Sequence, residues 1–452
     1  MAYDALPELI ATEHAADGIR IPPDVTVPLT ARVRALIDTS EMRRLTRISQ
    51  LGLVALVYPG AVHSRFEHSL GVYRLALAFL GRLRRDNHFA TTVGEADAAA
   101  FVVAALVHDI GHWAYCHPLE DMGLPELPRH ESLVGRILGS GEPAEILRAE
   151  WGLEPARVAA LIDGTATDPA GILLHSLLSG PIDVDKMDYL ARDSLHAGVP
   201  YGRHFDQDRL LASLCIDARG QSLAITDKGR TAAELMVFAR YVMFSEVYWH
   251  HAVRAATGML QRAVWLVRDS IDAPWLTRAD EQGFIGWLKD AAAGTGAAPL
   301  VEGLFGPRRT LVKRVATYDA LNHPDIHRAL AGCSYPTTTR ISARLAERLS
   351  RRLGKAVAPE TLLIDAPPAE REVEFSLQVR QRPRDGGDRA GPGADQWRSL
   401  AELSPVVRSL AHEQFDDLVK RVRIFAPAAT AEAVSALPGG LLPDLFDAIA
   451  DS

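Results

Sequence analysis

Residues 95–117, EADAAAFVVAALVHDIGHWAYCH, join the most apolar helical stretch of the chain to a dense cluster of polar residues. Apolar residues surround this predicted helix on nearly every side, so we expect it at the centre of a helical bundle. Gly111 marks its end. The polar pair His108 and Asp109 falls at that buried end, where each unpartnered group would cost about 2–7 kcal/mol. A bound metal ion would remove that cost.

Histidines concentrate around this stretch. Seven of the 16 in the chain lie within one window of 68 residues, where even spacing would put about two: His63, His68, His88, His108, His112, His117 and His130. A lone histidine is usually a satisfied core or surface residue, but a cluster this dense requires a common cause. Neutral imidazole and ionised carboxylate together are typical ligands for transition metals. The cluster therefore predicts a metal site.

Composition narrows the class of protein. With 452 residues, 48% of them hydrophobic, and a net charge of −8, the chain has the profile of a globular protein that does not bind nucleic acid through its whole surface. Its cysteines, Cys116, Cys215 and Cys333, form no CxxC pair, which argues against disulfides and a thiolate zinc site. No apolar run could span a membrane, and the first residues do not resemble a signal peptide. We therefore expect a cytoplasmic location.

The pattern of elements predicts a mainly α protein. We expect a helical domain over residues 1–270, with its core at about 38–200, and a smaller α+β lobe over residues 271–452. Helices are predicted from Ser40 through EMRRLTRISQL, from about Arg65, and over a very long helical stretch from about Lys228 to Asp269. QSLAIT, LLIDAP, VEFSLQV and RVRIFAP have the composition of strands. Residues 382–397 are predicted to be flexible because they are rich in glycine and proline.

Four ordered blocks resemble a known family. VHSRFEHSLGV, LVHDIGHWAYCH, HES and IDVDKMDYLARD are similar to the HD phosphohydrolase superfamily, and most of all to its deoxynucleoside triphosphate triphosphohydrolase branch. The resemblance runs from about Asp38 to about His251, nearly half the chain. It implies a helical HD-domain bundle and metal-dependent hydrolysis of deoxynucleoside triphosphates to deoxynucleoside and inorganic triphosphate.

The resemblance implies one metal ion held by four residues: His68, His108, Asp109 and Asp185. Two imidazoles and two carboxylates suit iron, manganese, zinc or nickel, and leave positions for water and a phosphate oxygen. The ligand types do not select among these metals. The resemblance also implies a magnesium ion that accompanies the triphosphate.

Further residues match the family's catalytic groups. Phosphate-ester hydrolysis needs a proton for the leaving oxygen, and imidazole suits this task because its ordinary pKa is about 6.5. The resemblance implies that His117 donates the proton while His112 and His130 contact phosphate. Glu120 and Glu131 could orient these imidazoles. The family commonly has aspartate where Glu120 stands, and Glu131 could instead be a helix-start carboxylate.

The resemblance also implies contacts to phosphate and sugar, by Gln50, Arg65, Lys186, Tyr189, Asp193, Arg240 and Tyr248. Gln50 matches a glutamine that reads the sugar 3′-hydroxyl, and Tyr189 would pack against the sugar and exclude a ribose by steric clash. Without the family, Tyr248 would be assigned to core packing, and Lys186 to a solvated helix face or a phosphate contact with equal weight.

Alternative functions and partners remain open. The same site could serve a nucleotidase or phosphodiesterase acting on monophosphate, cyclic or nucleic-acid phosphate esters, and a scaffold with a structural metal is a third reading. The family implies a homo-oligomer, either a dimer or a tetramer. Asp38 matches a guanine-reading position of the family's activator site, but Arg43 and Thr46 depart from it. The basic stretches 306–314 and 340–355 are read as solvated faces rather than as nucleic-acid or effector sites.

Overall fold

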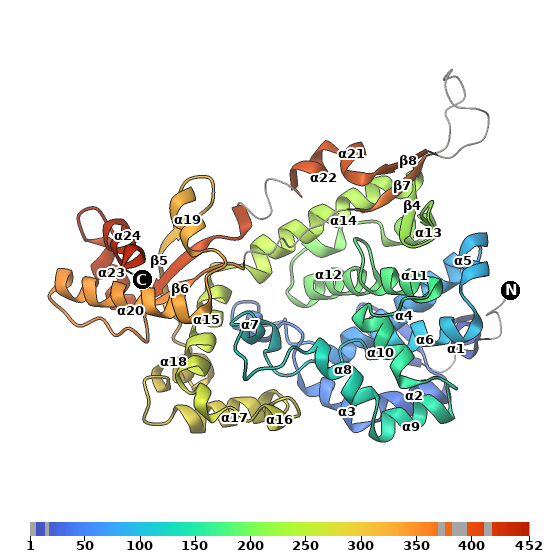
Figure 1. Ribbon diagram of the computed structural model, residues 1–452, viewed down its shortest axis with the longest axis horizontal. Helices are drawn as coiled ribbons and strands as arrows, with labels where there is room; N and C mark the ends of the chain where they lie inside the picture. The colour runs from blue at the N-terminus through green and yellow to red at the C-terminus, as the bar shows by residue number, and fades with distance from the viewer. Residues whose placement is uncertain (1–5, 14–17, 369–375, 382–395, 411–417, 452) are drawn as a thin grey trace, which may run out of the picture.

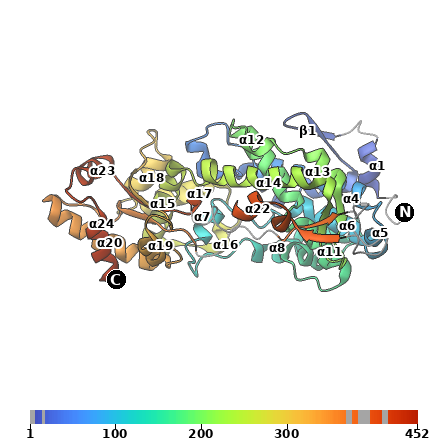
Figure 2. The same cartoon turned by 90° about the horizontal axis from the view of Figure 1, so that it is seen from above.

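The computed structural model describes residues 6–13, 18–368, 376–381, 396–410 and 418–451. The molecule is elongated, with the N-terminal helices α1 and α5 near one end and α20, α23 and α24 at the other (Figures 1 and 2). It is mainly helical, with small sheets, and a smaller α+β region follows the helical first part, which confirms the predicted fold class. No helix in these ranges is long and apolar enough to cross a membrane.

Helix α6 (Glu95–Val107) is the centre of the first part. Every residue from Ala98 to Val107 is buried, as the sequence predicts for a helix that is apolar on all sides. It packs against α4 (Arg65–Leu83), α10 (Pro155–Asp163) and α11 (Pro169–Leu178). His108 caps its C-terminus, so His108 and Asp109 emerge where the helix leaves the core.

Helices α4 and α12 (Val184–His196) lie against each other beside α6. Ser64 caps α4 by accepting a hydrogen bond from the backbone N–H of Glu67, and Asp183 caps α12 through the N–H of Lys186. Gly71 permits the close approach, because a Cβ at this position would collide with Asp188 and Arg192 of α12. The contact places the start of α4 beside the start of α12.

The long helix predicted over residues 228–269 is interrupted, so that prediction is wrong. The chain forms α14 (Arg230–Met243), a π-helical turn at Phe244–Tyr248, and then α15 (His251–Leu266). Between α14 and α15, Trp249 and His250 have backbone conformations that are not helical. The apolar spacing continues across the break, which is why periodicity alone does not reveal it.

The first predicted helix is also shorter than expected. Thr39, not Ser40, caps α3 (Ser40–Arg44), and a 3₁₀ turn follows at Leu45–Arg47. The chain then runs extended beside the segment that precedes α4, and the backbone N–H of Gln50 donates to the carbonyl of His63 at 2.9 Å. This crossing brings Gln50 close to the N-terminus of α4.

The remaining helices of the first part are α1 (Pro7–Glu13), α2 (Ala31–Ile37), α5 (Asn87–Thr92), α7 (Cys116–Glu120), α8 (Glu131–Leu138), α9 (Gly141–Ala149) and α13 (Gln207–Ser213). Those of the second part are α16 (Ala273–Leu276), α17 (Glu281–Ala292), α18 (Ala298–Phe305), α19 (Pro324–Leu330), α20 (Tyr335–Leu353), α21 (Leu400–Leu403), α22 (Pro405–Ser409), α23 (Ala428–Ser435) and α24 (Leu442–Ala450).

Three small sheets accompany the helices. The first is the hairpin β1 (Gly18–Ile21) and β2 (Val25–Pro28). The second has the order β3-β4-β7-β8, formed by Leu214–Ile216, Leu223–Thr226, Gln378–Gln381 and Gln396–Ser399. The third has the order β5-β9-β6, formed by Lys313–Tyr318, Val422–Ala426 and Leu363–Asp365. QSLAIT, LLIDAP and RVRIFAP are thus confirmed as strands.

Part of the predicted C-terminal lobe folds onto the first part of the chain. Strand β7 pairs in parallel with β4, and α22 contacts α14 (Figure 1). The division at about residue 270 stays a proposal, in which β7, β8, α21 and α22 belong spatially with the first part. Residues 373–375 of VEFSLQV, and residues 382–395 of the predicted flexible segment, lie outside the described residues, and the last two residues of VEFSLQV begin β7.

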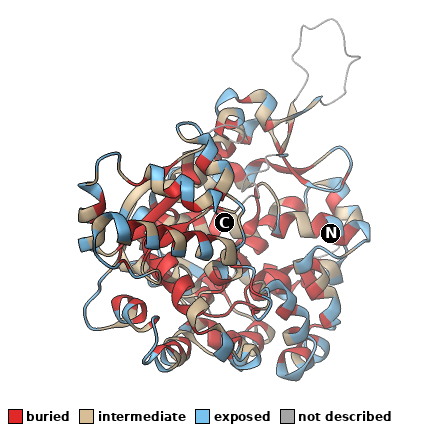
Figure 3. Cartoon of the chain, turned by 60° about the vertical axis from the view of Figure 1, so that its left-hand side comes forward, coloured by how far each residue is buried: buried red, intermediate tan, exposed pale blue. Residues whose placement is uncertain are grey.

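Buried residues run through the interior of both parts, and exposed residues lie on the outer faces (Figure 3). The Phe101 side chain on α6 is 0% exposed, whereas Phe238 on α14 is 49% exposed. We predict that Phe101→Ala lowers the free energy of unfolding by about 3–5 kcal/mol because it leaves a cavity. Phe238→Ala is the matched control and should change it by no more than about 0.5 kcal/mol. Denaturant titration measures both, and equal losses would contradict the central position of α6.

Candidate active site

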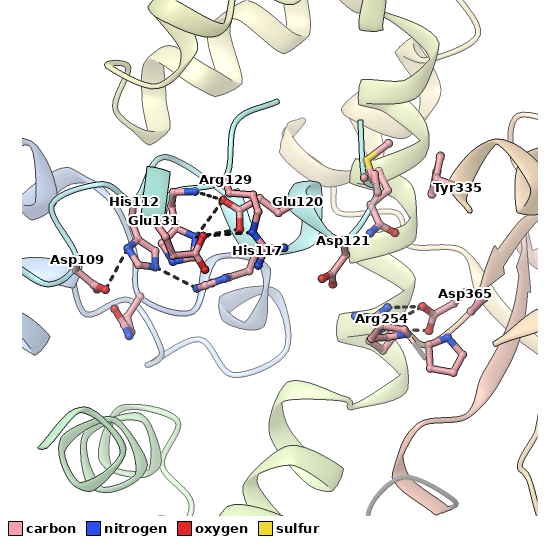
Figure 4. Close-up of a pocket in the computed structure, with 18 of the residues that line it drawn as sticks. Asp109, His112, His117, Glu120, Asp121, Arg129, Glu131, Arg254, Tyr335 and Asp365 are labelled. Carbon is pink, nitrogen blue, oxygen red and sulfur yellow. Dashed lines mark hydrogen bonds and ion pairs between the residues drawn. The ribbon is translucent and has the colours of Figure 1, made fainter. Parts of the chain in front are cut away.

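A cavity of about 940 Å³ opens between the helical first part and the second part of the chain. Figure 4 shows its histidine-rich wall, with His112, His117 and Glu131, facing a wall that carries Arg254, Tyr335 and Asp365. The predicted site residues that line it are Gln50, Arg65, His68, His108, Asp109, His112, His117, Glu120, His130, Glu131, Asp185 and Tyr189. Lys186, Asp193, Arg240 and Tyr248 do not line it.

The four predicted metal ligands converge from three helix ends. The His68 Nε2 atom on α4 lies 3.0 Å from Asp185 Oδ1 on α12 and 3.3 Å from His108 Nε2 at the end of α6. His108 Nε2 in turn lies 3.3 Å from Asp109 Oδ1. The ligand atoms of His68, His108 and Asp185 all lie within 4.8 Å of one another. This donor set fits one divalent ion with nitrogen and oxygen ligands.

Both imidazoles are oriented by contacts on their other nitrogen. His108 Nδ1 lies 3.0 Å from the carbonyl oxygen of Ala105, and His68 Nδ1 lies 2.9 Å from Asp188 Oδ2. The Arg192 guanidinium holds the Asp188 carboxylate with two hydrogen bonds of 2.8 Å. Metal-binding histidines usually have such a partner, which fixes the tautomer and turns Nε2 towards the ion.

The prediction from sequence missed Asp188, although a signal was present. Asp188 follows Asp185 by three residues in DVDKMD, so both carboxylates lie on one face of α12. One of them reaches His68 Nε2 and the other reaches His68 Nδ1. Arg192, which the sequence places on the same face as Asp185, instead pairs with Asp188 and with Glu67.

The electrostatics of this cluster favour a cation. Burial alone would lower the pKa of His68, but hydrogen bonds to Asp185 and Asp188 raise it to about 10. Burial would raise the pKa of Asp109, but the charges of His112, His108 and Arg65 hold it well below its ordinary value. Positive charge is therefore stabilised among these groups, and a metal ion can take the place of the proton on His68.

Three further histidines form the adjoining wall. His112 Nδ1 lies 3.1 Å from Asp109 Oδ1, and its Nε2 lies 3.2 Å from His117 Nε2. The Glu120 carboxylate holds His130 through the ring Nδ1 at 2.9 Å and the backbone N–H at 2.7 Å. Glu120 therefore reaches His130, and Glu131 is a more distant neighbour at 3.5 Å.

Glu281 on α17 anchors two loops of this wall, and no sequence pattern indicates this role. One carboxylate oxygen accepts a hydrogen bond from Tyr115 Oη at 2.8 Å. The other accepts bonds from the backbone N–H and the side chain of Ser49, at 2.9 and 2.6 Å. Tyr115 adopts a left-handed conformation, with φ at 58°, just before α7. These bonds position Gln50 and His117, which follow the anchored residues closely.

The predicted phosphate and sugar residues divide into two groups. Gln50, Arg65 and Tyr189 line the cavity beside the four-residue cluster, where Arg65 Nη1 lies 3.0 Å from Asp109 Oδ2. The second group contacts neighbouring side chains of the protein and does not line the cavity: Lys186, Asp193, Arg240 and Tyr248. Lys186 Nζ pairs with Asp183 at 2.5 Å. Tyr248 Oη donates to Asp193 at 2.6 Å.

Two further contacts complete this second group. The other oxygen of the Asp193 carboxylate lies 2.9 Å from His63 Nε2, so His63 is a structural neighbour of the site. The Arg240 guanidinium lies over the Phe244 ring, 5.7 Å from its centroid. Roles in substrate binding for Lys186, Asp193, Arg240 and Tyr248 stay predictions.

Family comparisons agree with this geometry. Residues 65–193 match the HD domain, and residues 205–438, more than half of the chain, match the HD-associated region. The chain belongs to the HD-domain phosphohydrolase superfamily. The HD domain match spans the four predicted ligands and the three wall histidines.

Individual proteins are also similar to this chain in sequence or in structure. The uncharacterized protein YwfO of Bacillus subtilis is 37% identical over 232 residues, 50% of each chain. Deoxynucleoside triphosphate triphosphohydrolase SAMHD1 of Gallus gallus is 29% identical over 256 residues, which cover 49% of this chain and 40% of that protein. A hypothetical protein from Aquifex aeolicus aligns in structure with a TM-score of 0.67 and 25% identity, over 93% of this chain and 99% of its own. The chain spans about half the length of the first curated relatives it matches.

The HD-associated region supplies the opposite wall of the cavity. Arg254 on α15 binds Asp365 on β6 through two nitrogens, at 2.5 to 3.1 Å, and its guanidinium lies over the Trp249 ring. Tyr335 and Cys333 line the cavity near the start of α20. The sequence did not indicate these residues, because they come from segments that meet only in the folded chain.

The orienting contact of Asp188 leads to a testable prediction. Asp188→Asn keeps the shape of the side chain but removes the charge that holds His68. We predict that the variant binds its metal about 10–100-fold more weakly. Competition with a metal-sensitive dye measures this affinity directly. Asp290→Asn, an exposed change on α17, is the control. Equal affinity in both variants would show that Asp188 has only a structural role.

Proposed function

We propose that this HD protein hydrolyses deoxynucleoside triphosphates to deoxynucleoside and inorganic triphosphate. The observation that carries the proposal is a complementary pair of unpartnered atoms in the cavity lining. Arg65 Nε, a donor, and Gln50 Oε1, an acceptor, are both buried and lack a hydrogen-bond partner among the described residues. Buried polar atoms are rarely left unsatisfied. A ligand with an anionic phosphate and a hydroxyl group would satisfy both once the two side chains turn towards the cavity.

The cluster of His68, His108, Asp109 and Asp185 would hold the metal ion, for which iron, manganese, zinc and nickel are all suitable. Such an ion neutralises charge on a phosphate oxygen and lowers the pKa of a coordinated water. Arg65 adds a second positive charge beside the same phosphate, and Asp109 fixes the direction of its guanidinium. A magnesium ion that enters with the triphosphate would screen the remaining phosphate charge.

The wall histidines would handle the proton and the phosphate oxygens. In the hydrolysis, the oxygen of a water molecule bonds to the α-phosphorus, the bond from phosphorus to the 5′-oxygen breaks, and that oxygen takes a proton. Removal from water and the positive charges of Arg65 and His130 lower the pKa of His117 to about 4. His117 is therefore neutral before substrate binds. The negative triphosphate favours its protonated form, which then serves as the donor.

The other site residues have supporting roles in this proposal. Glu120 would keep His130 oriented towards phosphate, with Glu131 and His112 beside it. Gln50 would bind the sugar 3′-hydroxyl, and Tyr189 would pack against the sugar. Lys186, Arg240, Asp193 and Tyr248 would reach the substrate only after their present contacts rearrange. Assembly into a homodimer or homotetramer and a cytoplasmic location stay predictions.

One observation favours the alternative function, an HD-type nucleotidase or phosphodiesterase. A triphosphate needs basic groups for its outer phosphates, but Lys186 is paired with Asp183 and neither Lys186 nor Arg240 lines the cavity. A monophosphate or phosphodiester would need only Arg65 and the metal ion. The products distinguish the two functions.

We predict that purified protein, supplied with manganese and magnesium, converts a deoxynucleoside triphosphate to deoxynucleoside and inorganic triphosphate. Ion-pair chromatography resolves these products. Asp185→Ala, which removes one metal ligand, should lower the rate by at least about 100-fold while the melting temperature shows that the protein remains folded. Release of pyrophosphate would rule out the proposed bond cleavage. Hydrolysis of monophosphates or diesters alone would support the alternative.

Tyr189 gives a second prediction, on sugar selectivity. Tyr189→Ala should lower the ratio of kcat/KM for a deoxynucleoside triphosphate to that for its ribonucleotide by about tenfold, because it opens space at the sugar 2′-position. Steady-state kinetics on the two substrates measure this ratio. An unchanged ratio, with both rates reduced equally, would place Tyr189 outside the sugar site.

A further inference from the structure

A second group of metal-ligand side chains lies beside the first, and it includes a cysteine. One donor atom from each of His112, Cys116, His117 and His130 lies within 4.8 Å of every other. Cys116 is buried at the start of α7. The wide spacing of the three cysteines argues against a thiolate site, but spacing along the chain does not show that one cysteine can join three histidines.

The histidines of this group are arranged as metal ligands usually are. The Glu120 carboxylate holds His130 through Nδ1, and His112 Nδ1 faces Asp109. Their other ring nitrogens are thereby free to turn inward, and His112 Nε2 already lies 3.2 Å from His117 Nε2. Two imidazole nitrogens this close repel unless a proton or a metal ion lies between them. Carboxylates behind histidines are the usual outer partners in zinc sites.

We propose that His112, Cys116, His117 and His130 form a second metal site, which takes a borderline-soft divalent ion such as zinc. A tetrahedral zinc ion with one sulfur and three nitrogen ligands separates its ligand atoms by about 3.3–3.6 Å. The observed group, whose donor atoms lie within 4.8 Å of one another, therefore needs a contraction of no more than about 1.5 Å in any of these distances. The sulfur ligand distinguishes this site from the cluster of His68, His108, Asp109 and Asp185, which offers only nitrogen and oxygen.

Binding at this site is coupled to one proton. Burial raises the pKa of the Cys116 thiol to about 12, so the thiol is protonated in the metal-free protein. When zinc binds, the S–H bond breaks, a zinc–sulfur bond forms, and the proton leaves to solvent.

The site has a regulatory consequence that rests on the proposed function. Zinc at this position would occupy the imidazoles that handle phosphate and the proton, so it would inhibit hydrolysis while the first metal site stays filled. The binding measurement below does not depend on activity, so a failure of the proposed function would leave its result unchanged.

Cobalt(II) is the probe, because a cobalt–thiolate bond gives a strong charge-transfer absorption in the near ultraviolet that nitrogen and oxygen ligands do not. The full chain should bind two cobalt ions, and the second should bring this band. Cys116→Ser and Cys116→Ala should bind one ion and lose the band. Zinc added in competition should abolish the band in the wild-type protein.

Matched variants show which side chain produces the charge-transfer band. Cys333→Ser removes the cysteine that lines the cavity and should keep the band, as should Cys215→Ser. Asp185→Ala should lose one cobalt ion but keep the band, because it disturbs only the first site. One bound ion without a thiolate band in the wild-type protein would overturn the proposal. A band that persists in folded Cys116→Ser protein would also overturn it.

Discussion

The site depends on acidic groups gathered around one histidine in a helical core. Asp109 and Asp188 are buried where α4, α6 and α12 meet, so water screens their charges little. Asp185, which is partly exposed and lines the cavity, contacts His68 there. Such a group is stable only if positive charge accompanies it. Arg65 supplies that charge at Asp109 and Arg192 supplies it at Asp188. Asp185 has no comparable arginine partner among the described ion pairs, and a metal ion beside it would complete the balance.

The helical framework is consistent with this requirement. The fully buried α6 ends at His108, so one end of the most apolar element positions two of the four predicted ligands. Gly71 lets α4 and α12 come close enough for His68 to lie between two carboxylates of α12. The caps at Ser64 and Asp183 fix where those helices begin. Stability and ligand placement therefore have common causes.

The sequence predicted the structural features that depend on local residue patterns or on recognisable motifs. The position of α6, the start of α4 and the four clustered ligands follow from apolar periodicity and from blocks that resemble the HD family. It did not predict that α14 and α15 are separate, because the apolar spacing runs through the π turn. It also missed the pairing of β7 with β4, which joins segments about 150 residues apart. Such pairing depends on side-chain packing that no local pattern records.

The same limit applies to the site. Asp188 could have been found from its spacing to Asp185, since both lie on one face of α12. Glu281, Arg254 and Asp365 gave no signal, because each acts on a segment distant in the chain. Conversely, Lys186 and Tyr248 match the family, yet they are engaged in ion pairing or hydrogen bonding outside the cavity lining. Motifs thus identify residue types more reliably than they identify which side chains face the cavity.

The central claim is that His68, His108, Asp109 and Asp185 together hold one metal ion. Anomalous diffraction from crystals of metal-loaded protein, collected at the absorption edge of that metal, tests it most directly. We expect a peak about 2.0–2.2 Å from the Nε2 atoms of His68 and His108, with carboxylate oxygens of Asp109 and Asp185 at similar distances. An anomalous peak elsewhere in the structure, with His68 still in direct contact with Asp185, would contradict this claim.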